Sequence, residues 1–300
     1  MLVSAIITTK NRKELLVRAI NSVLHQTYKE IECVVVDDGS TDGTEKFLEE
    51  LIKNNSIRYI HIPSNESKGG NHARNVGAKK ANGNILAFLD DDDEWMPEKI
   101  ELQMNKMQRD DKVGFVYCGM VREKNFDKRT RKEDNFESER FDVKNISDIV
   151  LRKIVTNTST IMIKKDLFEI IGGFDEQLTC LQEYDLCVRA FQKTKVDCVK
   201  KALVLYRILD GDCKRISNMI SGWEKSLKII SEKNKDLFMR LSKQEMSERM
   251  ICIYLDGIER ARRAKSMKFL VKYTAKLFAC SGKLSFVGKK LLKGKMQQRI

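Results

Sequence analysis

The chain has 300 residues, of which 42% are hydrophobic and only 2 are proline, so it can bury a full core and leaves little room for disordered linkers. No stretch approaches the roughly 20 apolar residues of a membrane-spanning helix, which argues against an integral membrane protein. The net charge is +13, but residues 261–300 hold 12 of the Lys and Arg residues and no acidic residue, so the sequence predicts a local electrostatic contact made by this tail.

The N-terminal part alternates between predicted strands and helices. Strands are expected at 3–8, 31–37, 57–62 and 85–89, and helices at about 11–25, 42–53 and 71–80. Asn11 with Glu14, and Asp42 with Glu45, have the spacing of capping boxes that would open the first two helices. Strands that alternate with helices predict βαβ units and an α/β fold with a mostly parallel, Rossmann-like sheet.

The later part of the chain is less regular. Strands are expected at 113–118, 159–163 and 196–206, helices at 166–171 and 183–193, and a charged surface loop at 122–140. After about Gly211 the pattern is helical, so we expect a first domain over 1–212 and a helical C-terminal region over 213–300. The 8 scattered cysteines contain no C-x-x-C pair, which favours buried thiols in a cytosolic protein over a zinc site. The N-terminus lacks the basic segment of a secretory signal.

Four consecutive aspartates, Asp90 to Asp93, follow the apolar run at 85–89. Adjacent carboxylates repel one another and burial disfavours their charge, unless a hard divalent cation shares their oxygens. In an extended segment Asp90 and Asp92 project to the same side and can approach one ion together. A solvated acidic turn is the alternative.

Two further segments carry polar residues near predicted strand or helix ends. Asp38 follows the second strand, where an acid can bind a nucleoside, although an Asp-Gly pair also simply starts turns. The loop at 69–77 joins two glycines to a helix, an arrangement that lets backbone approach an anion. Within it, Gly70 and Arg74 could contact a nucleotide, or Arg74 could be a surface arginine.

Several motifs together resemble the family 2 glycosyltransferases with the GT-A fold. The matching strings, in order, are SAIITTKNR, SVLHQTYKEIECVVVDDGSTDGT, KGGNHARNVGAKKANGNILAFLDDDDEWMPEKI, GGFDEQL and QEYDLCVRAF. They cover about the first 210 residues. The resemblance implies transfer of a sugar from a nucleotide diphosphate donor, most often a UDP-sugar, to an acceptor hydroxyl with inversion. It also implies a donor half over about 1–97 and an acceptor half over about 98–212.

The resemblance assigns roles to individual residues. Asp92 and Asp90 match the metal ligands of the family, for Mg²⁺ or Mn²⁺, while Lys10 stands where the family often has an aromatic residue. The general base would be Glu183, with Asp185 as the rival; Asp185 also suits a structural pair with Arg189. The residues expected to contact the nucleotide sugar are Thr8, Asn11, Arg12, Asp38, Gly70, Arg74, Asp90 and Asp91.

The basic tail contains a predicted amphipathic helix at 267–278, with apolar residues and lysines on neighbouring faces. Such a helix can bind an anionic membrane surface. Alternatively, its apolar stripe packs on the catalytic domain, or its charge attracts nucleic acid, although no specific nucleic-acid motif is present. We therefore expect a cytoplasmic enzyme, peripheral at the inner face of the membrane.

The expected acceptor is a glycan or lipid-linked glycan of a surface polysaccharide such as a capsule. Two other functions stay open at this point. A sugar-phosphate nucleotidyltransferase would want a glycine-rich N-terminal loop, which residues 8–12 do not provide. A non-catalytic basic adaptor for membrane or nucleic acid would not need the acidic residues.

Overall fold

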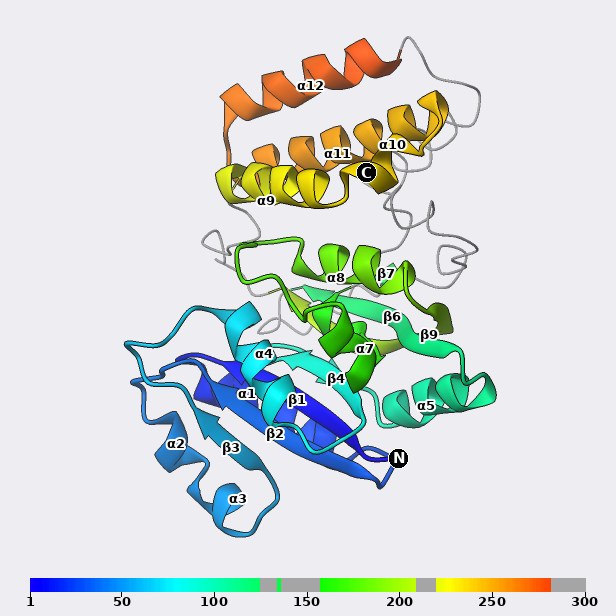
Figure 1. The fold of residues 1–300 in the computed structure, drawn as a ribbon. Helices are drawn as coiled ribbons and strands as arrows, with labels where there is room; N and C mark the ends of the chain where they lie inside the picture. Colours follow the sequence, from blue (N-terminus) through cyan, green and yellow to red (C-terminus); the bar gives the residue numbers. More distant parts are fainter. Residues whose placement is uncertain (125–133, 136–156, 209–219, 282–300) are drawn as a thin grey trace. The chain divides into compact units, whose positions relative to one another are not determined.

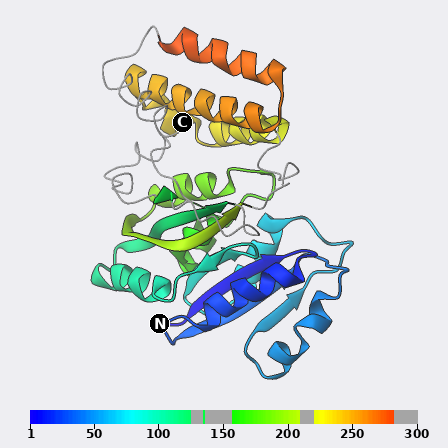
Figure 2. The same ribbon diagram turned by 180° about the vertical axis from the view of Figure 1, so that it is seen from behind.

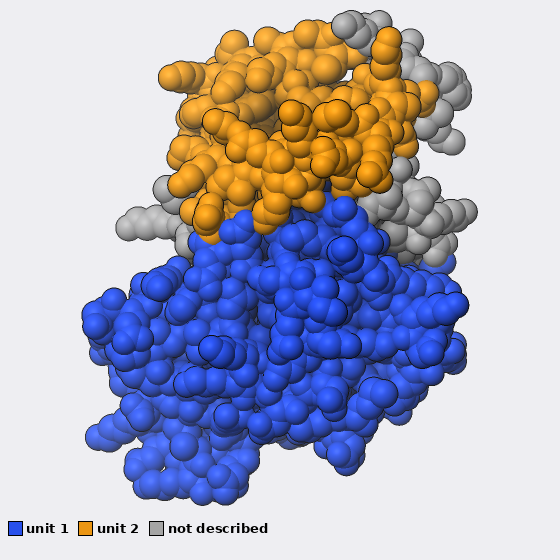
Figure 3. Space-filling view, viewed as in Figure 1, with its two compact units in different colours: residues 1–143, 154–176, 182–210 blue, residues 144–153, 177–181, 211–300 orange. Residues whose placement is uncertain are grey.

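The computed structural model describes residues 1–124, 134–135, 157–208 and 220–281. The chain divides into two compact units (Figure 3). The first unit comprises residues 1–143, 154–176 and 182–210, and the second comprises 144–153, 177–181 and 211–300.

The first unit is built on one sheet, whose described strands follow the order β3-β2-β1-β4-β8-β6-β9-β5 (Figures 1 and 2). Four strands are mutually parallel: β1 (Val3–Thr9), β2 (Ile31–Asp37), β3 (Arg58–His61) and β4 (Ile85–Asp90). Most residues of β1, β2 and β4 are buried, as expected for strands covered on both faces, whereas in β3 only Ile60 is buried.

The other half of the sheet mixes directions. The short strand β8 (Met162–Lys164) runs antiparallel between β4 and β6 (Val113–Lys124), and β9 (Lys195–Ile208) is parallel to β6. Two strands of two residues complete the sheet, namely β5 (Glu94–Trp95) on β9 and β7 (Asp134–Asn135) on β6. The expected α/β fold with a mostly parallel sheet is therefore present, since β1 to β4, β6 and β9 run in the same direction.

Helices flank this sheet (Figure 1). The helix α1 buries Leu16, Ala19, Ile20 and Val23, which recur at the spacing of one helix face. The helices of this unit are α1 (Lys13–Leu24), α2 (Thr44–Phe47), α3 (Glu49–Lys53), α4 (Gly70–Lys80), α5 (Lys99–Arg109), α7 (Lys165–Ile170) and α8 (Gln182–Phe191).

The predicted capping box of the first helix is wrong. Arg12 occupies the N-cap position of α1 without a side-chain cap. Asn11 lies in the left-handed region at φ 55°. Its side-chain oxygen accepts a 2.7 Å hydrogen bond from the Thr41 backbone N–H, and its own N–H donates to Ser40 Oγ at 2.8 Å. Asn11 therefore joins the β1–α1 and β2–α2 loops instead of capping α1.

Other local expectations need correction. The helix predicted over 42–53 is split at Leu48 into α2 and α3. The strand predicted over 159–163 begins as a 3₁₀ turn at Thr158–Thr160, and strand geometry starts only at Met162. The loop predicted from 122 is a continuation of β6 as far as Lys124, and most of 122–140 lies outside the described residues. The sequence patterns do not predict α5.

The described part of the second unit consists mainly of helices, as expected for the chain after about Gly211. Its core includes Trp223 and Tyr273, whose rings meet edge to face at 5.5 Å. Every helix in the described part of the chain is too short or too polar to cross a lipid bilayer. The described helices of this unit are α9 (Ile220–Lys233), α10 (Lys235–Met239), α11 (Lys243–Arg263) and α12 (Met267–Ser281).

The strand order places a switch point at β1. The chain passes from β1 to β2 and β3 on one side and then returns to β4 on the other side. Connections that leave in opposite directions open a crevice at the carboxyl ends of the strands, where ligands of such folds bind. Thr9, Asp37 and Asp90 are the last residues of β1, β2 and β4 and so lie around this crevice.

Candidate functional site

The four aspartates form a turn rather than an extended segment. The strand β4 ends at Asp90, and the Asp93 N–H donates back to the Asp90 carbonyl at 3.1 Å. This turn brings ligand oxygens of Asp90, Asp92 and Asp93 within 4.8 Å of one another. Asp90 and Asp92 thus approach each other as predicted, but through the turn and not through strand alternation. Such a set of carboxylate oxygens suits a hard divalent cation.

Asp93 is fully buried and anchors this turn. It accepts a 2.5 Å hydrogen bond from Ser159 Oγ, while Ser159 Oγ accepts a 3.1 Å bond from the Asp90 N–H. The Trp95 indole N–H also donates to the Ser159 carbonyl at 2.8 Å. Burial, followed by the charges of Asp92 and Asp90, raises the pKa of Asp93 well above its usual value. The 3₁₀ turn before β8 therefore fixes the acidic turn through the hydrogen bonds of Ser159.

Replacing Ser159 by alanine is expected to lower the free energy of unfolding by about 1–3 kcal/mol, since Asp93 would lose a buried hydrogen-bond donor. Urea unfolding checks this value. Ser22→Ala is the matched control because the Ser22 hydroxyl donates only within α1, to the Ala19 carbonyl at 2.8 Å. That control should change stability by less than about 0.5 kcal/mol. Equal effects of the two changes would contradict a special role for Ser159.

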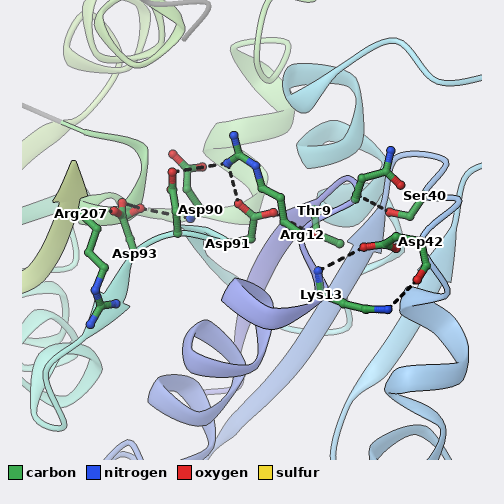
Figure 4. Close-up of polar contacts among 12 residues, drawn as sticks. Thr9, Arg12, Lys13, Ser40, Asp42, Asp90, Asp91, Asp93 and Arg207 are labelled. Carbon is green, nitrogen blue, oxygen red and sulfur yellow. Dashed lines mark hydrogen bonds and ion pairs between the residues drawn. The ribbon is translucent and has the colours of Figure 1, made fainter. Parts of the chain in front are cut away.

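Asp91 connects the acidic turn to β1 and α1. Its carboxylate accepts a 2.7 Å hydrogen bond from Thr9 Oγ1 and lies 3.2 Å from Arg12 Nη1. Burial raises the pKa of Asp91 to about 6, against the opposing effects of Arg12 and Thr9. Figure 4 shows Arg12 reaching from the start of α1 toward this carboxylate. Thr9 was not singled out in the sequence, whereas its neighbour Thr8 is buried in β1 beside Asp90.

Arg74 supplies a second cation at the same turn. It is buried in α4, and its Nη2 donates to Asp90 Oδ1 at 2.6 Å. Gly70 leaves room for the Arg74 guanidinium, because a Cβ at residue 70 would lie only 3.1 Å from Arg74 Nη1. Arg74 is therefore not the surface arginine of the alternative interpretation.

Asp38 closes the opposite side of the crevice. Its Oδ2 accepts hydrogen bonds from Ser67 Oγ at 2.8 Å and from the Gly69 N–H at 2.9 Å, which ties the glycine loop to the end of β2. Its Oδ1 is buried and has no partner within the described part of the protein. A buried carboxylate oxygen without a donor is costly, so it is suited to receive an N–H or O–H from a ligand.

The two acids proposed as base differ sharply. Asp185 is fully buried, and its Oδ2 accepts hydrogen bonds from Arg189 Nε at 2.9 Å and Nη2 at 2.6 Å. The suggested Asp185–Arg189 pair is thus present. Glu183 is half-buried in the first turn of α8. Asp185 is thus enclosed and paired with an arginine, whereas the side chain of Glu183 is partly open to solvent.

A contact that the sequence does not predict joins α4 to the loop before residue 177. Asn75 donates to the Phe174 carbonyl at 2.8 Å and accepts from the Phe174 N–H at 2.9 Å. Asn71 donates to the Asp175 carbonyl at 3.0 Å. Gly173 is required beside it, because a Cβ there would come within 2.7 Å of Asn75 Oδ1. The helix that carries Arg74 is therefore fixed to the segment that leads toward α8.

A cavity of about 720 Å³ lies beside the end of β2, between β3 and the short helices α2 and α3. Asp37, Tyr59 and His61 belong to its lining, and Tyr59 donates to Asp37 at 2.5 Å. Its lining contains none of the residues expected to contact a donor or a metal.

The model of the family described as glycosyl transferase family 2 matches residues 4–171. The chain belongs to this family. The matched range includes Asp38, Arg74 and the four aspartates, but it ends before Glu183.

Individual relatives within the family cover part of the chain. An uncharacterized glycosyltransferase of Rickettsia prowazekii is 35% identical over 69% of this chain. The match spans 64% of that relative's own length. A UDP-Glc:α-D-GlcNAc-diphosphoundecaprenol β-1,3-glucosyltransferase of Escherichia coli, WfaP, is 42% identical over 42% of this chain and 48% of its own length.

Solved structures show the same fold at low identity. The Staphylococcus aureus TarS 1–349 structure superposes with a TM-score of 0.58 at 17% identity, covering 95% of this chain and 93% of that one. The Pyrobaculum calidifontis mannosyltransferase in complex with GDP-Man and Mn²⁺ gives a TM-score of 0.59 at 18% identity, covering 99% and 79%. Both likenesses support the GT-A fold.

Proposed function

We propose that this family 2 enzyme transfers a sugar from a nucleotide diphosphate donor, with a UDP-sugar as the favoured donor, to a hydroxyl of a glycan acceptor. The observation that carries the proposal is the acidic turn, with oxygens of Asp90, Asp92 and Asp93 within 4.8 Å at the switch point of the sheet. Sugar nucleotides place a diphosphate beside such carboxylates through a divalent cation.

The donor would lie between the two sides of the crevice. Asp38 Oδ1 would accept a hydrogen bond from the base or ribose, since it is buried and has no donor within the described part of the protein. Arg74 lies at the start of α4 with a buried Nε that likewise lacks an acceptor there. Thr8, Asn11 and Gly70 complete the proposed donor residues through their positions at the crevice.

The acidic turn fits Mg²⁺ or Mn²⁺ as a cofactor. Asp92 and Asp90 would be its ligands, because Asp93 is committed to Ser159 and to the Arg207 N–H at 3.3 Å. A bound cation would neutralise the charge of the leaving diphosphate. TarS has been solved with UDP-GlcNAc, and the P. calidifontis enzyme with Mn²⁺, which supports a metal-assisted nucleotide-sugar site here.

Glu183 would accept the proton of the attacking hydroxyl. The Asp185–Arg189 pair occupies the rival carboxylate, which supports this choice. A single displacement with one base inverts the anomeric configuration, so a second carboxylate nucleophile is not needed.

A lipid-linked acceptor is the finer part of the proposal. The relative WfaP is named for a diphosphoundecaprenol-linked acceptor, and it matches 42% of this chain. We propose a similar step in surface-polysaccharide synthesis, such as capsule, at the cytoplasmic face of the membrane.

Isothermal titration of the whole chain with UDP-, GDP- and dTDP-sugars, with and without Mn²⁺, tests the proposed function. We expect one nucleotide to bind preferentially and to bind more tightly with Mn²⁺. Failure to bind any of these nucleotides under either condition would overturn the proposal. Release of pyrophosphate from a nucleoside triphosphate and a sugar phosphate would assign the site to nucleotidyl transfer instead.

The proposed membrane contact is α12. One side of this helix packs within the helical unit, because Tyr273 is buried against Trp223 and its hydroxyl donates to Glu224. The exposed apolar residues of α12 include Met267, Val271 and Phe278, and its exposed lysines include Lys268 and Lys276. Apolar side chains bordered by lysines suit an anionic bilayer surface.

Changing Met267, Val271 and Phe278 together to serine is expected to weaken binding to anionic vesicles at least about tenfold, since each buried apolar side chain contributes about 1.5–3 kcal/mol. Vesicle sedimentation measures this. Deletion of 261–300 is a poorer test because it would remove Tyr273 from the core of the unit. Ile170→Ser is the control, since Ile170 is an exposed apolar residue of the first unit. Unchanged sedimentation of the triple variant would reject the contact.

A further inference from the structure

Arg12 makes long contacts with two carboxylates of the acidic turn. One nitrogen, Nη1, lies 3.2 Å from Asp91 Oδ1 and 3.4 Å from Asp92 Oδ2. Both distances are long for charge-assisted hydrogen bonds, and sharing one nitrogen lacks the geometry of a bidentate pair. The Arg12 side chain is 42% exposed, so solvent screens both ion pairs.

Arg74 at the same turn behaves differently. Its contact with Asp90 is 2.6 Å, and its side chain is only 9% exposed. At the acidic turn, Arg74 therefore makes a short and buried ion pair with Asp90. The more exposed Arg12 makes longer ion pairs with Asp91 and Asp92. Of these two arginines, Arg12 has by far the more exposed side chain and so the greater freedom to move away from its carboxylates.

The backbone before Arg12 fixes where this side chain begins. Asn11 is locked by its bonds to Ser40 and Thr41, so the Arg12 side chain starts at the rim of the crevice and reaches over the carboxylates (Figure 4). A rotation about its own side-chain bonds can move the guanidinium while this loop stays in place. The loop thus keeps Arg12 close to any ligand of the turn.

We propose that Arg12 is an exchangeable counterion: it neutralises Asp91 and Asp92 when no divalent cation is bound, and a cation at Asp92 displaces it onto the donor diphosphate. This inference rests on the proposed function. A dication and a guanidinium repel each other, so they cannot both occupy the space beside Asp92. A diphosphate relieves this repulsion because it pairs with both cations. Metal and nucleotide binding are therefore coupled, each strengthening the other by the same factor.

The test measures Mn²⁺ binding by electron paramagnetic resonance with and without UDP, which needs no catalytic turnover. In the wild-type chain, UDP should tighten Mn²⁺ binding by at least roughly fivefold. In Arg12→Gln, Mn²⁺ should bind roughly five times more tightly than in wild type without UDP, because no side chain competes, and the effect of UDP should shrink. Arg12→Lys retains a competing charge and should stay closer to wild type.

The control is Arg109→Gln, which removes the same charge from an exposed position at the end of α5. It should leave Mn²⁺ binding and its response to UDP unchanged. Weaker or unaltered Mn²⁺ binding in Arg12→Gln would overturn the counterion exchange, provided that the wild-type chain binds UDP. If the wild-type chain binds no sugar nucleotide at all, the proposed function fails instead.

Discussion

Asp92→Asn is expected to lower the rate of sugar transfer roughly 100- to 1,000-fold, which is the largest effect among our predictions. The substitution keeps the size of the side chain but removes a charge that a divalent cation needs. Asp92 is only 12% exposed and forms no part of the Asp93–Ser159 anchor, so the fold should tolerate the change. The loss should therefore appear in catalysis and in metal binding, not in stability.

Three measurements separate these possibilities. Transfer is followed by release of the nucleoside diphosphate, metal binding by Mn²⁺ titration, and stability by urea unfolding. Asp111→Asn is the matched control, since Asp111 is an exposed acid in the loop after α5 and should give wild-type values in all three. Full transfer activity in Asp92→Asn would remove this residue from the metal site and with it the main support for metal assistance.

Glu183→Gln is expected to reduce turnover roughly 100- to 10,000-fold while donor binding stays near wild type. Glutamine keeps the length of the side chain but cannot accept a proton from the acceptor hydroxyl. The substitution lies on α8, whereas the proposed donor residues lie on β1, β4, α4 and the intervening loops. The dissociation constant of the donor should therefore stay close to the wild-type value.

Asp185→Asn, at the rival carboxylate, is expected to affect mainly the stability of the protein and not its turnover. The substitution removes the negative charge of the fully buried Asp185 and leaves Arg189 without its ion-pair partner. The free energy of unfolding should therefore fall by about 3–5 kcal/mol. Urea unfolding measures this loss, and turnover of the fraction that stays folded should exceed that of Glu183→Gln. If Glu183→Gln retains full turnover and folded Asp185→Asn does not, the base is Asp185.

The alternation of elements in the first unit could be predicted because each signal is local. The buried strands β1, β2 and β4 are short apolar runs, and α1 repeats apolar residues at the spacing of a helix face. The capping box at Asn11 failed because a contact with Thr41, distant in sequence, outweighed a local pattern. The helix over 42–53 failed for a related reason, since the chain bends at Leu48, which is buried in the core.

In the acidic turn, too, a local sequence signal predicts some residues, whereas others are recognised only through contacts with distant residues. Four aspartates after an apolar run predict clustered carboxylates, and in the structure three of them, Asp90, Asp92 and Asp93, have oxygens within 4.8 Å of one another. Ser159, which anchors the turn, lies 66 residues from Asp93 and is an ordinary serine in the sequence. Thr9 and Asn75 are likewise recognisable only through their partners, Asp91 and Phe174.

The sequence by itself determined the α/β class, the family resemblance and the acids at the ends of β2 and β4, because these depend on residue type and short spacing. Only the tertiary structure decided which cation faces which carboxylate, that Arg74 is buried at the acidic turn, and that Tyr273 belongs to the helical core. The physical reason is that pairing of charges and burial depend on strand order and helix packing, which join residues far apart along the chain.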